Sequence, residues 1–183
     1  MNDRTAGPAD DAPWDSARYL REILRAPVYE ASEHTPLQVM ATLSARVGST
    51  VEVKREDLQA VHSFKIRGAY NAMRSLTDAQ RARGVVTASA GNHAQGVARS
   101  ASVLGVRATI VMPTVTPRIK IDAVRSLGGE VLLRGENFDA AKAEAQRLSE
   151  VESLTFIAPF DDPRVIAGQG TIGLEIIQQD AEL

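Results

Sequence analysis

The chain has 183 residues, of which 44% are hydrophobic and 24% charged, and this composition excludes disordered, collagen-like and coiled-coil proteins. Lys and Arg total 21 against 23 Asp and Glu, so the net charge is -2 and the chain lacks the basic surface of a nucleic-acid-binding protein. Because there is no Cys, disulfide frameworks, thiolate metal sites and cysteine nucleophiles are excluded as well.

We expect residues 1–13, which are acidic and rich in small side chains, to form a disordered tail. This segment lacks the basic flank and apolar core of a signal peptide, and no run in the chain approaches the ~18 apolar residues that span a bilayer. The sequence therefore predicts a cytoplasmic protein with no membrane partner. A first helix is expected over residues 16–25, with Asp15 or Ser16 as its N-cap, followed by an extended segment at residues 35–37.

A regular alternation of short β-rich runs and amphipathic helical patterns begins at residue 50. The expected strands lie at residues 50–54, 85–89, 107–112, 130–134 and 154–158. The expected helix boundaries are capping signals at Thr77, Thr116 and Asp162 and glycines at Gly84, Gly105 and Gly128. Strands that alternate with helices in this way predict an α/β fold, in which an open, mostly parallel, twisted sheet carries helices on both faces.

Ligands of such sheets bind beyond the carboxyl ends of the strands, so the loops at those ends are the first candidates for chemistry. The loop over residues 59–68 holds Lys65 in the first turn of an expected helix, for which Ser63 could supply the cap. The positive end of the helix dipole and burial beside Phe64 and Ile66 both favour the neutral amine, which is a nucleophile toward aldehydes. The alternative is a solvated surface lysine.

A second loop, residues 89–93, lies between an expected strand and a helix that begins near Asn92. Free backbone N–H groups at the helix start, a glycine that permits close approach, and hydroxyl, amide and imidazole groups could together hold a small anion such as a carboxylate. These groups belong to Ser89, Gly91, Asn92 and His93. The alternative is an ordinary turn whose Ser and Asn only cap the backbone.

Residues 168–173 match the dinucleotide fingerprint G-x-G-x-x-G, but a helix is expected to begin already at Pro163, so the glycines fall inside it. We therefore expect them to allow close packing of that helix on a neighbouring backbone rather than nicotinamide binding. His34 and His62 have no partners at metal-ligand spacing, so no metal site is predicted. The sequence contains no nucleophile elbow and no P-loop, which removes the commonest hydrolase and NTPase interpretations.

Four segments, taken with their order and spacing, resemble the pyridoxal-phosphate enzymes of the tryptophan-synthase β fold type, and among these the threonine dehydratases (threonine ammonia-lyases). The segments are residues 53–57 (VKRED), 62–69 (HSFKIRGA), 89–96 (SAGNHAQG) and 167–171 (AGQGT). The match extends from about residue 19 to the end of the chain. Residues 24–30 are more similar to the biosynthetic, isoleucine-pathway enzymes than to their catabolic relatives.

The resemblance implies a cofactor, pyridoxal 5'-phosphate, held by Lys65 as an internal aldimine, with Phe64 packed beside it and Asn92 hydrogen-bonded to the ring hydroxyl. It implies that the substrate carboxylate is held by Ser89, Gly91, Asn92 and His93. The implied reaction is β-elimination of water from L-threonine, in which Lys65 removes the α-proton, to give 2-oxobutanoate and ammonia as the first step of isoleucine biosynthesis.

The residue at position 90, an alanine, helps to distinguish elimination from racemization. In racemases similar to this family a serine occupies its position and serves as the base on the opposite face, so alanine favours elimination. Serine racemase, serine dehydratase and other ammonia-lyases of the same fold are alternatives, and serine is a possible second substrate. A non-catalytic α/β binding module is the alternative from a different class.

The resemblance also implies a glycine-rich phosphate loop and a small hydroxyl residue facing the pyridine nitrogen, both expected beyond Leu183. We therefore expect the chain to be an N-terminal part that is inactive alone. The expected division is an incomplete large cofactor domain over residues 14–53 and 154–183 and a small α/β domain over residues 54–153. The family further implies a homo-oligomer, specifically a tetramer.

Overall fold

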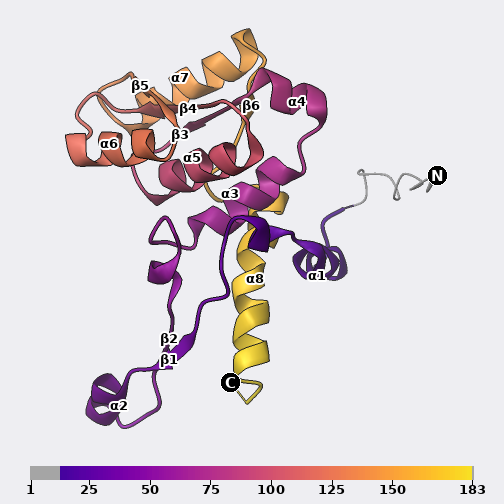
Figure 1. The fold of residues 1–183 in the computed structure, drawn as a ribbon, viewed down its shortest axis with the longest axis vertical. Coiled ribbons are helices and arrows are strands. Elements are labelled where there is room, and N and C mark those ends of the chain that lie inside the picture. The colour runs from indigo at the N-terminus through magenta and orange to yellow at the C-terminus, as the bar shows by residue number, and fades with distance from the viewer. Residues whose placement is uncertain (1–12, 183) are drawn as a thin grey trace, which may run out of the picture.

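The structure, a computed structural model, describes residues 13–182, so nearly all of the predicted tail over residues 1–13 lies outside the described residues. Its body is a four-stranded sheet covered by helices, from which a long helix and a two-stranded arm extend in the same general direction (Figure 1). Within the described part of the chain, no helix is long and apolar enough to cross a bilayer.

The main sheet is parallel, with the strand order β5-β4-β3-β6. Its strands are Val85–Ala88 (β3), Ala108–Met112 (β4), Glu130–Leu133 (β5) and Thr155–Phe156 (β6). β3 lies inside the sheet and is buried along its whole length, as expected for β-branched and small residues covered on both faces. The four strands predicted after residue 84 are confirmed, and so is the mostly parallel α/β class.

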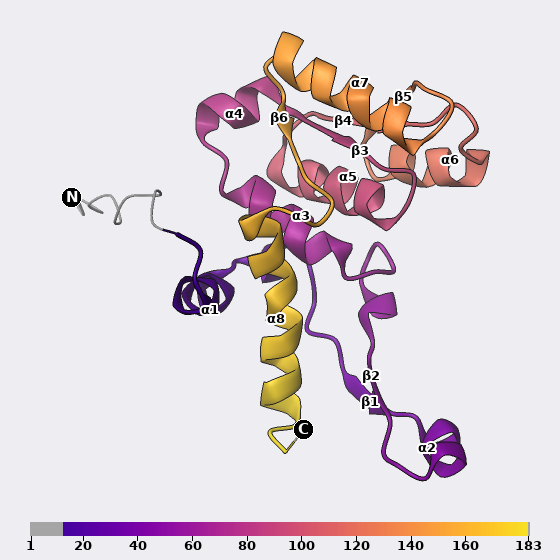
Figure 2. The same cartoon turned by 180° about the vertical axis from the view of Figure 1, so that it is seen from behind.

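Helices cover both faces of the sheet. The helices are α3 (Lys65–Arg74), α5 (Asn92–Leu104), α6 (Arg118–Ser126) and α7 (Phe138–Val151). Because side chains alternate along a strand, Val85 and Ile110 pack with α3, α5 and α6, whereas Val86 and Val111 pack with α7. Figure 2 shows α7 on one side of the sheet and α5 and α6 on the other.

Several predicted helix boundaries are confirmed. The helices concerned are α1 (Ser16–Arg25), α4 (Asp78–Arg83) and α8 (Pro163–Gln179). Asp15, Thr77 and Asp162 each accept backbone N–H groups of the first turn that follows them, which satisfies donors that the helix itself cannot pair. α4 and α5 end at Gly84 and Gly105, where φ is 98° and 64°, a region that favours glycine.

The predicted strand at residues 50–54 is only partly correct. It becomes β2 (Glu52–Lys54), which pairs antiparallel with β1 (Leu37–Val39) in a separate two-stranded sheet. A local pattern specifies extended backbone but not the partner, which here is the segment that follows Pro36. The link between the strands contains α2 (Ala41–Val47), which the sequence did not predict because it has no side-chain cap and buries none of its residues.

Two predicted caps, Ser63 and Thr116, are wrong. The N-cap of α3 is Phe64, whose φ of -65° and ψ of -15° are already helical, so the extended geometry of a capping residue is absent. α6 has Pro117 at its N-cap and likewise no side-chain cap. The hydroxyl groups of Ser63 and Thr116 are buried without a hydrogen-bond partner among the described residues.

The glycines of residues 168–173 lie inside α8, as predicted, and bring its backbone close to two other helices. A Cβ at Gly168 would lie 2.6 Å from the carbonyl oxygen of Arg67 in α3. A Cβ at Gly170 would meet the side chain of Ile23 in α1. The prediction of close backbone packing is therefore confirmed, and it fixes α8 against the helix that carries Lys65.

Candidate active site

The candidate site lies where β3 and β6 end and where α3 and α5 begin, at the carboxyl end of the parallel sheet. α3 starts at Lys65, and α5 packs against this point through Gly96. A Cβ at Gly96 would lie 3.0 Å from the carbonyl oxygen of Lys65 and 3.2 Å from the backbone nitrogen of Ile66. Glycine therefore lets the first turn of α3 lie against α5, which brings the two predicted loops together.

The Lys65 side chain is half-buried and has a defined direction. Its Nζ donates a hydrogen bond to the carbonyl oxygen of Pro159 at 2.7 Å and lies 5.3 Å from the ring centroid of Phe64. Burial lowers the pKa of the Lys65 amine below its ordinary value. The Phe64 ring is 40% exposed, so a partly buried amine stands beside an open aromatic surface. The solvated-lysine interpretation does not fit this geometry.

The loop over residues 89–93 leads from β3 into α5. The Ser89 N–H donates to the carbonyl oxygen of Val111 at 3.2 Å, and the Ser89 hydroxyl accepts the Gly91 N–H at 3.3 Å. Gly91 is the N-cap of α5, and no side chain caps the helix there. The exposed side chain of Asn92 therefore does not cap α5, and the N–H groups of its first turn stay available to an anion.

His93 is buried and neutral. Its Nε2 lies 3.1 Å from the carbonyl oxygen of Ile157, which also accepts the Thr87 hydroxyl at 2.8 Å. Burial, with a smaller contribution from the Lys65 charge, lowers the pKa of His93 to about 4. The proton therefore resides on Nε2, and the buried Nδ1 is an acceptor with no partner among the described residues.

The segment that follows β6 joins the two loops. Lys65 binds the carbonyl group of Pro159, and His93 binds that of Ile157, two residues earlier. The structure thus brings Phe64, Lys65 and His93 around one short stretch of backbone, with Ser89, Gly91 and Asn92 in the adjoining loop. Sequence reasoning missed this segment, although its position at the end of the strand predicted over residues 154–158 was a usable signal.

The remaining histidines serve other contacts. Nδ1 of His62 lies 3.1 Å from the carbonyl oxygen of Asp57, and His34 stacks on Tyr29 with ring centroids 4.0 Å apart. Within residues 13–182, no group of three or more His, Cys, Asp or Glu side chains is arranged to hold a metal ion.

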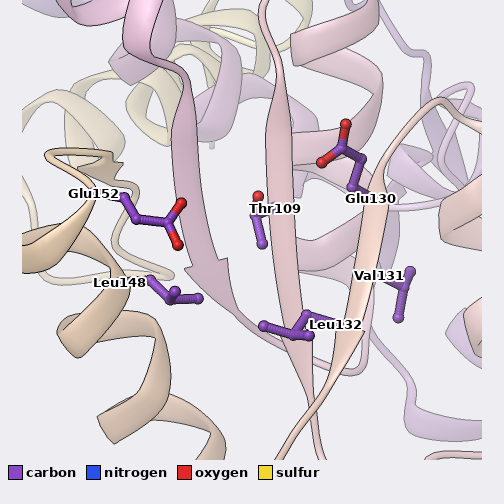
Figure 3. Close-up of a pocket in the computed structure, with 6 residues that line it drawn as sticks. All are labelled: Thr109, Glu130, Val131, Leu132, Leu148 and Glu152. Carbon is purple, nitrogen blue, oxygen red and sulfur yellow. The ribbon is translucent and has the colours of Figure 1, made fainter.

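A cavity of about 270 Å³ lies at the other end of the sheet, near the amino ends of β4 and β5 and the end of α7 (Figure 3). Its lining residues are Thr109, Glu130, Val131, Leu132, Leu148 and Glu152. The lining offers two carboxylates and one hydroxyl group but no amine, and it lies away from Lys65. We therefore assign it no part in the chemistry of the candidate site.

Comparison with known proteins identifies the family. Residues 28–182, most of the chain, match the family described as pyridoxal-phosphate dependent enzyme. The chain belongs to this family. The resemblance seen in the sequence is therefore confirmed, and pyridoxal phosphate is the cofactor of the family.

Individual members of the pyridoxal-phosphate family show how similar the chain is to them. It is 62% identical over 176 residues to the biosynthetic L-threonine dehydratase of Escherichia coli (strain K12). This match covers 96% of the chain and 34% of the E. coli protein. The chain thus spans about a third of the length of the curated relatives it matches.

Solved structures agree with this assignment. The processed form of threonine deaminase isoform 2 from Solanum lycopersicum matches 91% of this chain with a TM-score of 0.88 and 54% identity, over 49% of its own length. Maize serine racemase matches 90% with a TM-score of 0.84 and 34% identity, over 50% of its own length. The predicted fold type is confirmed by these neighbours.

The residues at the candidate site fit the family's cofactor. A half-buried amine of lowered pKa suits the aldehyde of pyridoxal phosphate, and the exposed Phe64 ring offers a flat surface to an aromatic ring. The uncapped start of α5 and the unpaired buried Nδ1 of His93 are polar groups that no described residue satisfies. Such groups are typical of a surface built to meet a ligand.

Proposed function

We propose that the protein to which this chain belongs deaminates L-threonine to 2-oxobutanoate and ammonia by pyridoxal-phosphate-dependent β-elimination of water. The proposal rests above all on the half-buried Lys65 amine of lowered pKa, which lies beside the exposed Phe64 ring at the carboxyl end of the sheet. It is supported by similarity to proteins named threonine dehydratase or threonine deaminase. In this proposal the reaction opens isoleucine biosynthesis and takes place in the cytoplasm.

We assign the cofactor to Lys65, Phe64 and Asn92. Lys65 would hold its aldehyde carbon, Phe64 would pack beside its ring, and the exposed amide of Asn92 would reach its ring hydroxyl. When bound, the cofactor supplies an electron sink for the negative charge that develops at the substrate α-carbon.

Lys65 is also the base that we propose for the α-proton. A base must be unprotonated when it acts, and burial shifts the Lys65 amine toward that state. The hydrogen bond to the Pro159 carbonyl oxygen holds Nζ at the mouth of the loop rather than in solvent. A positioned general base contributes roughly 10²- to 10⁴-fold to the rate, so its loss should nearly abolish turnover.

We assign the substrate carboxylate to the loop over residues 89–93. The Ser89 oxygen accepts the Gly91 N–H, which leaves the Ser89 O–H free to donate. The backbone N–H groups of Asn92 and His93 lie in the uncapped first turn of α5, where the helix dipole favours an anion. The Nε2–H group of His93 donates a hydrogen bond to the Ile157 carbonyl oxygen, so in this proposal His93 contributes through its backbone N–H and by fixing the loop.

Serine racemization is the second candidate, because maize serine racemase has a similar fold over the matched residues. Ala90 favours elimination in our proposal, since it offers no base on the opposite face. Chiral chromatography after incubation with L-serine distinguishes the two: D-serine would support racemization, whereas pyruvate alone would support elimination.

The test uses the complete polypeptide that carries this chain. We expect it to form 2-oxobutanoate from L-threonine, and we expect Lys65→Ala to lower kcat/KM at least about 100-fold. Lys120→Ala is the matched control, because Lys120 is an exposed lysine on α6. Retention of activity within about tenfold of wild type in Lys65→Ala, about 1.4 kcal/mol of barrier, would remove Lys65 from the mechanism.

We also propose a division of the chain into a small α/β domain over residues 54–153 and part of a larger cofactor domain over residues 14–53 and 154–183. β6 lies beyond that boundary and yet pairs with β3, so the boundary crosses the sheet.

We further propose that the complete polypeptide forms a homo-oligomer, specifically a tetramer, which sedimentation of that polypeptide tests.

A further inference from the structure

A cluster of buried charges connects α3 to the rest of the fold, two residues beyond Lys65. We call it the ionic junction, and its members are Lys54, Glu56, Arg67 and Glu175. The Arg67 side chain is fully buried, and its Nε and Nη2 each donate to the Glu56 carboxylate at 2.8 Å. Its Nη1 donates to Glu175 at 2.6 Å. One guanidinium thus joins the segment after β2 to α8.

Glu175 is the second centre of the junction. Its carboxylate lies 2.6 Å from the Lys54 ammonium and accepts the Tyr29 hydroxyl at 2.7 Å, and His34 approaches to 3.6 Å. Burial alone would raise the pKa of Glu175, but hydrogen bonds from Arg67, Lys54 and Tyr29 outweigh it and hold this pKa at about 2. Every charge that faces Arg67 is therefore paired at neutral pH.

The junction lies close to Lys65 along the helix. α3 has no side-chain cap, so side chains of its first turn must fix how it begins. Gly96 of α5 and Gly168 of α8 let their backbones approach that turn closely, but they form no directional bond to it. Beside one hydrogen bond from the Gly68 N–H to the Gln169 side chain at 3.3 Å, Arg67 supplies the directional contacts of this turn to other elements, because its planar guanidinium binds two carboxylates from two of them.

We propose that Arg67 is a positioning residue: clamped between Glu56 and Glu175, it sets the depth at which the Lys65 amine lies in the site. The inference rests on the proposed function for the use of that amine. The effect of Arg67 on the burial of Lys65 does not depend on that function, because it concerns only how far the amine is removed from water. Without the fork, the first turn of α3 is free to shift and Lys65 becomes more exposed.

Arg67→Lys tests this idea with the charge retained. An ammonium cannot reproduce the fork that binds Glu56 through two nitrogens and Glu175 through a third. Arg74→Lys is the matched control, since Arg74 is an exposed arginine on the same helix that pairs with Glu30 at 3.2 Å.

The readout is the pH dependence of lysine acetylation by brief exposure to acetic anhydride, followed by peptide mass spectrometry. The wild-type chain has four lysines, Lys54, Lys65, Lys120 and Lys142, and each Arg→Lys variant adds a fifth, so fragmentation of the peptides assigns the label to single residues. In the wild-type protein we expect the labelling midpoint of Lys65 to lie below the ordinary range of a lysine amine, because burial lowers its pKa. In Arg67→Lys we expect the labelling of Lys65 at pH 8, relative to Lys120, to fall about threefold or more as its midpoint rises.

An unchanged Lys65 midpoint in Arg67→Lys would overturn the proposal, even if the variant melted at a lower temperature, because a merely structural role affects melting alone. A shift of the same size in Arg74→Lys would also overturn it. Should Arg67→Lys fail to fold, Glu175→Gln is used instead, because it removes one charge and keeps the shape of the side chain. No cofactor is present in this measurement, so its failure is distinct from failure of the proposed function, which the threonine assay tests.

Discussion

The ionic junction and the candidate site adjoin each other on α3, but their buried polar groups differ: those of the junction are paired, whereas several of those at the site are not. In the junction, Arg67 and Glu175 are fully buried and each has several partners. In the site, Nδ1 of His93 is buried without a partner among the described residues, as is the hydroxyl of Ser63, which directly precedes Phe64, and no side chain caps α5.

This difference in hydrogen bonding distinguishes residues that stabilise the fold from residues that are available to bind a ligand. A buried donor or acceptor left unpaired costs about 1 to 3 kcal/mol, so an unpaired group beside a candidate site is consistent with a ligand that pairs with it. Breaking a buried ion pair by removing one partner costs more, because the other charge stays buried and uncompensated. Substitutions that break the junction should therefore cost the most stability, and those that remove an unpaired group of the site should cost little.

The largest effect is expected in the junction. Arg67→Met should lower the free energy of unfolding by about 3 to 5 kcal/mol, because it leaves two buried carboxylates without their shared cation. Arg74→Met should cost less than about 1 kcal/mol, since its pair with Glu30 is exposed. Urea unfolding followed by circular dichroism measures both. Equal losses in the two variants would show that the buried network does not stabilise this fold.

The two regions should also lose stability in different pH ranges. His93 has a pKa of about 4 when folded and about 6.5 when unfolded, so unfolding takes up a proton between these values. Stability should fall by roughly 3 kcal/mol as the pH drops through that range, at about 1.4 kcal/mol per pKa unit. The stabilisation from Glu175 is intact through most of this range and is lost at lower pH, as the pH falls from about 4.3 toward its folded pKa of about 2.

His93→Gln isolates the first of these ranges. We expect its stability to change little between pH 6.5 and pH 4, the range over which the wild-type protein loses stability. Denaturant unfolding at a series of pH values checks this expectation. A wild-type slope in His93→Gln would mean that His93 is not the group that titrates.

The smallest expected effect is the difference in stability between removing a buried serine hydroxyl that has a hydrogen-bond partner and removing one that has none. Ser63→Ala removes a hydroxyl group that has no described partner, so it should leave stability unchanged or raise it by up to about 1 kcal/mol. Ser32→Ala, the control, loses a buried hydrogen bond of 2.8 Å to the carbonyl oxygen of Val28 and should cost about 1 kcal/mol. A loss in Ser63→Ala as large as in Ser32→Ala would contradict the distinction between the two regions.

Local patterns in the sequence predicted much of the fold and indicated the residues of the candidate site. Runs of β-branched residues identified β3, β4, β5 and β6, and capping chemistry identified the starts of α1, α4 and α8. Lys65 and the loop over residues 89–93 were found in the same way, because both lie where a helix begins. Signals of this kind depend on neighbours within one or two turns.

Long-range contacts account for what the sequence could not predict. The pairing of β2 with β1, and not with the parallel sheet, depends on a partner strand that no local pattern names. Arg67 and Glu175 are 108 positions apart, so their ion pair is invisible in the sequence even though Glu175 lies on the buried face of α8. The low pKa of His93 follows from burial, which only the folded chain defines.

The central claim, that Lys65 is the residue that bonds to pyridoxal phosphate, is tested most directly by chemical trapping. The complete polypeptide is mixed with the cofactor, reduced with borohydride, digested and analysed by mass spectrometry, which locates the pyridoxyl group among the four lysines of this chain and those of the rest of the polypeptide. We predict modification at Lys65 in preference to Lys54, Lys120 and Lys142, and its loss in a folded Lys65→Arg variant. Equal modification of the exposed lysines, or undiminished incorporation in Lys65→Arg, would contradict the account.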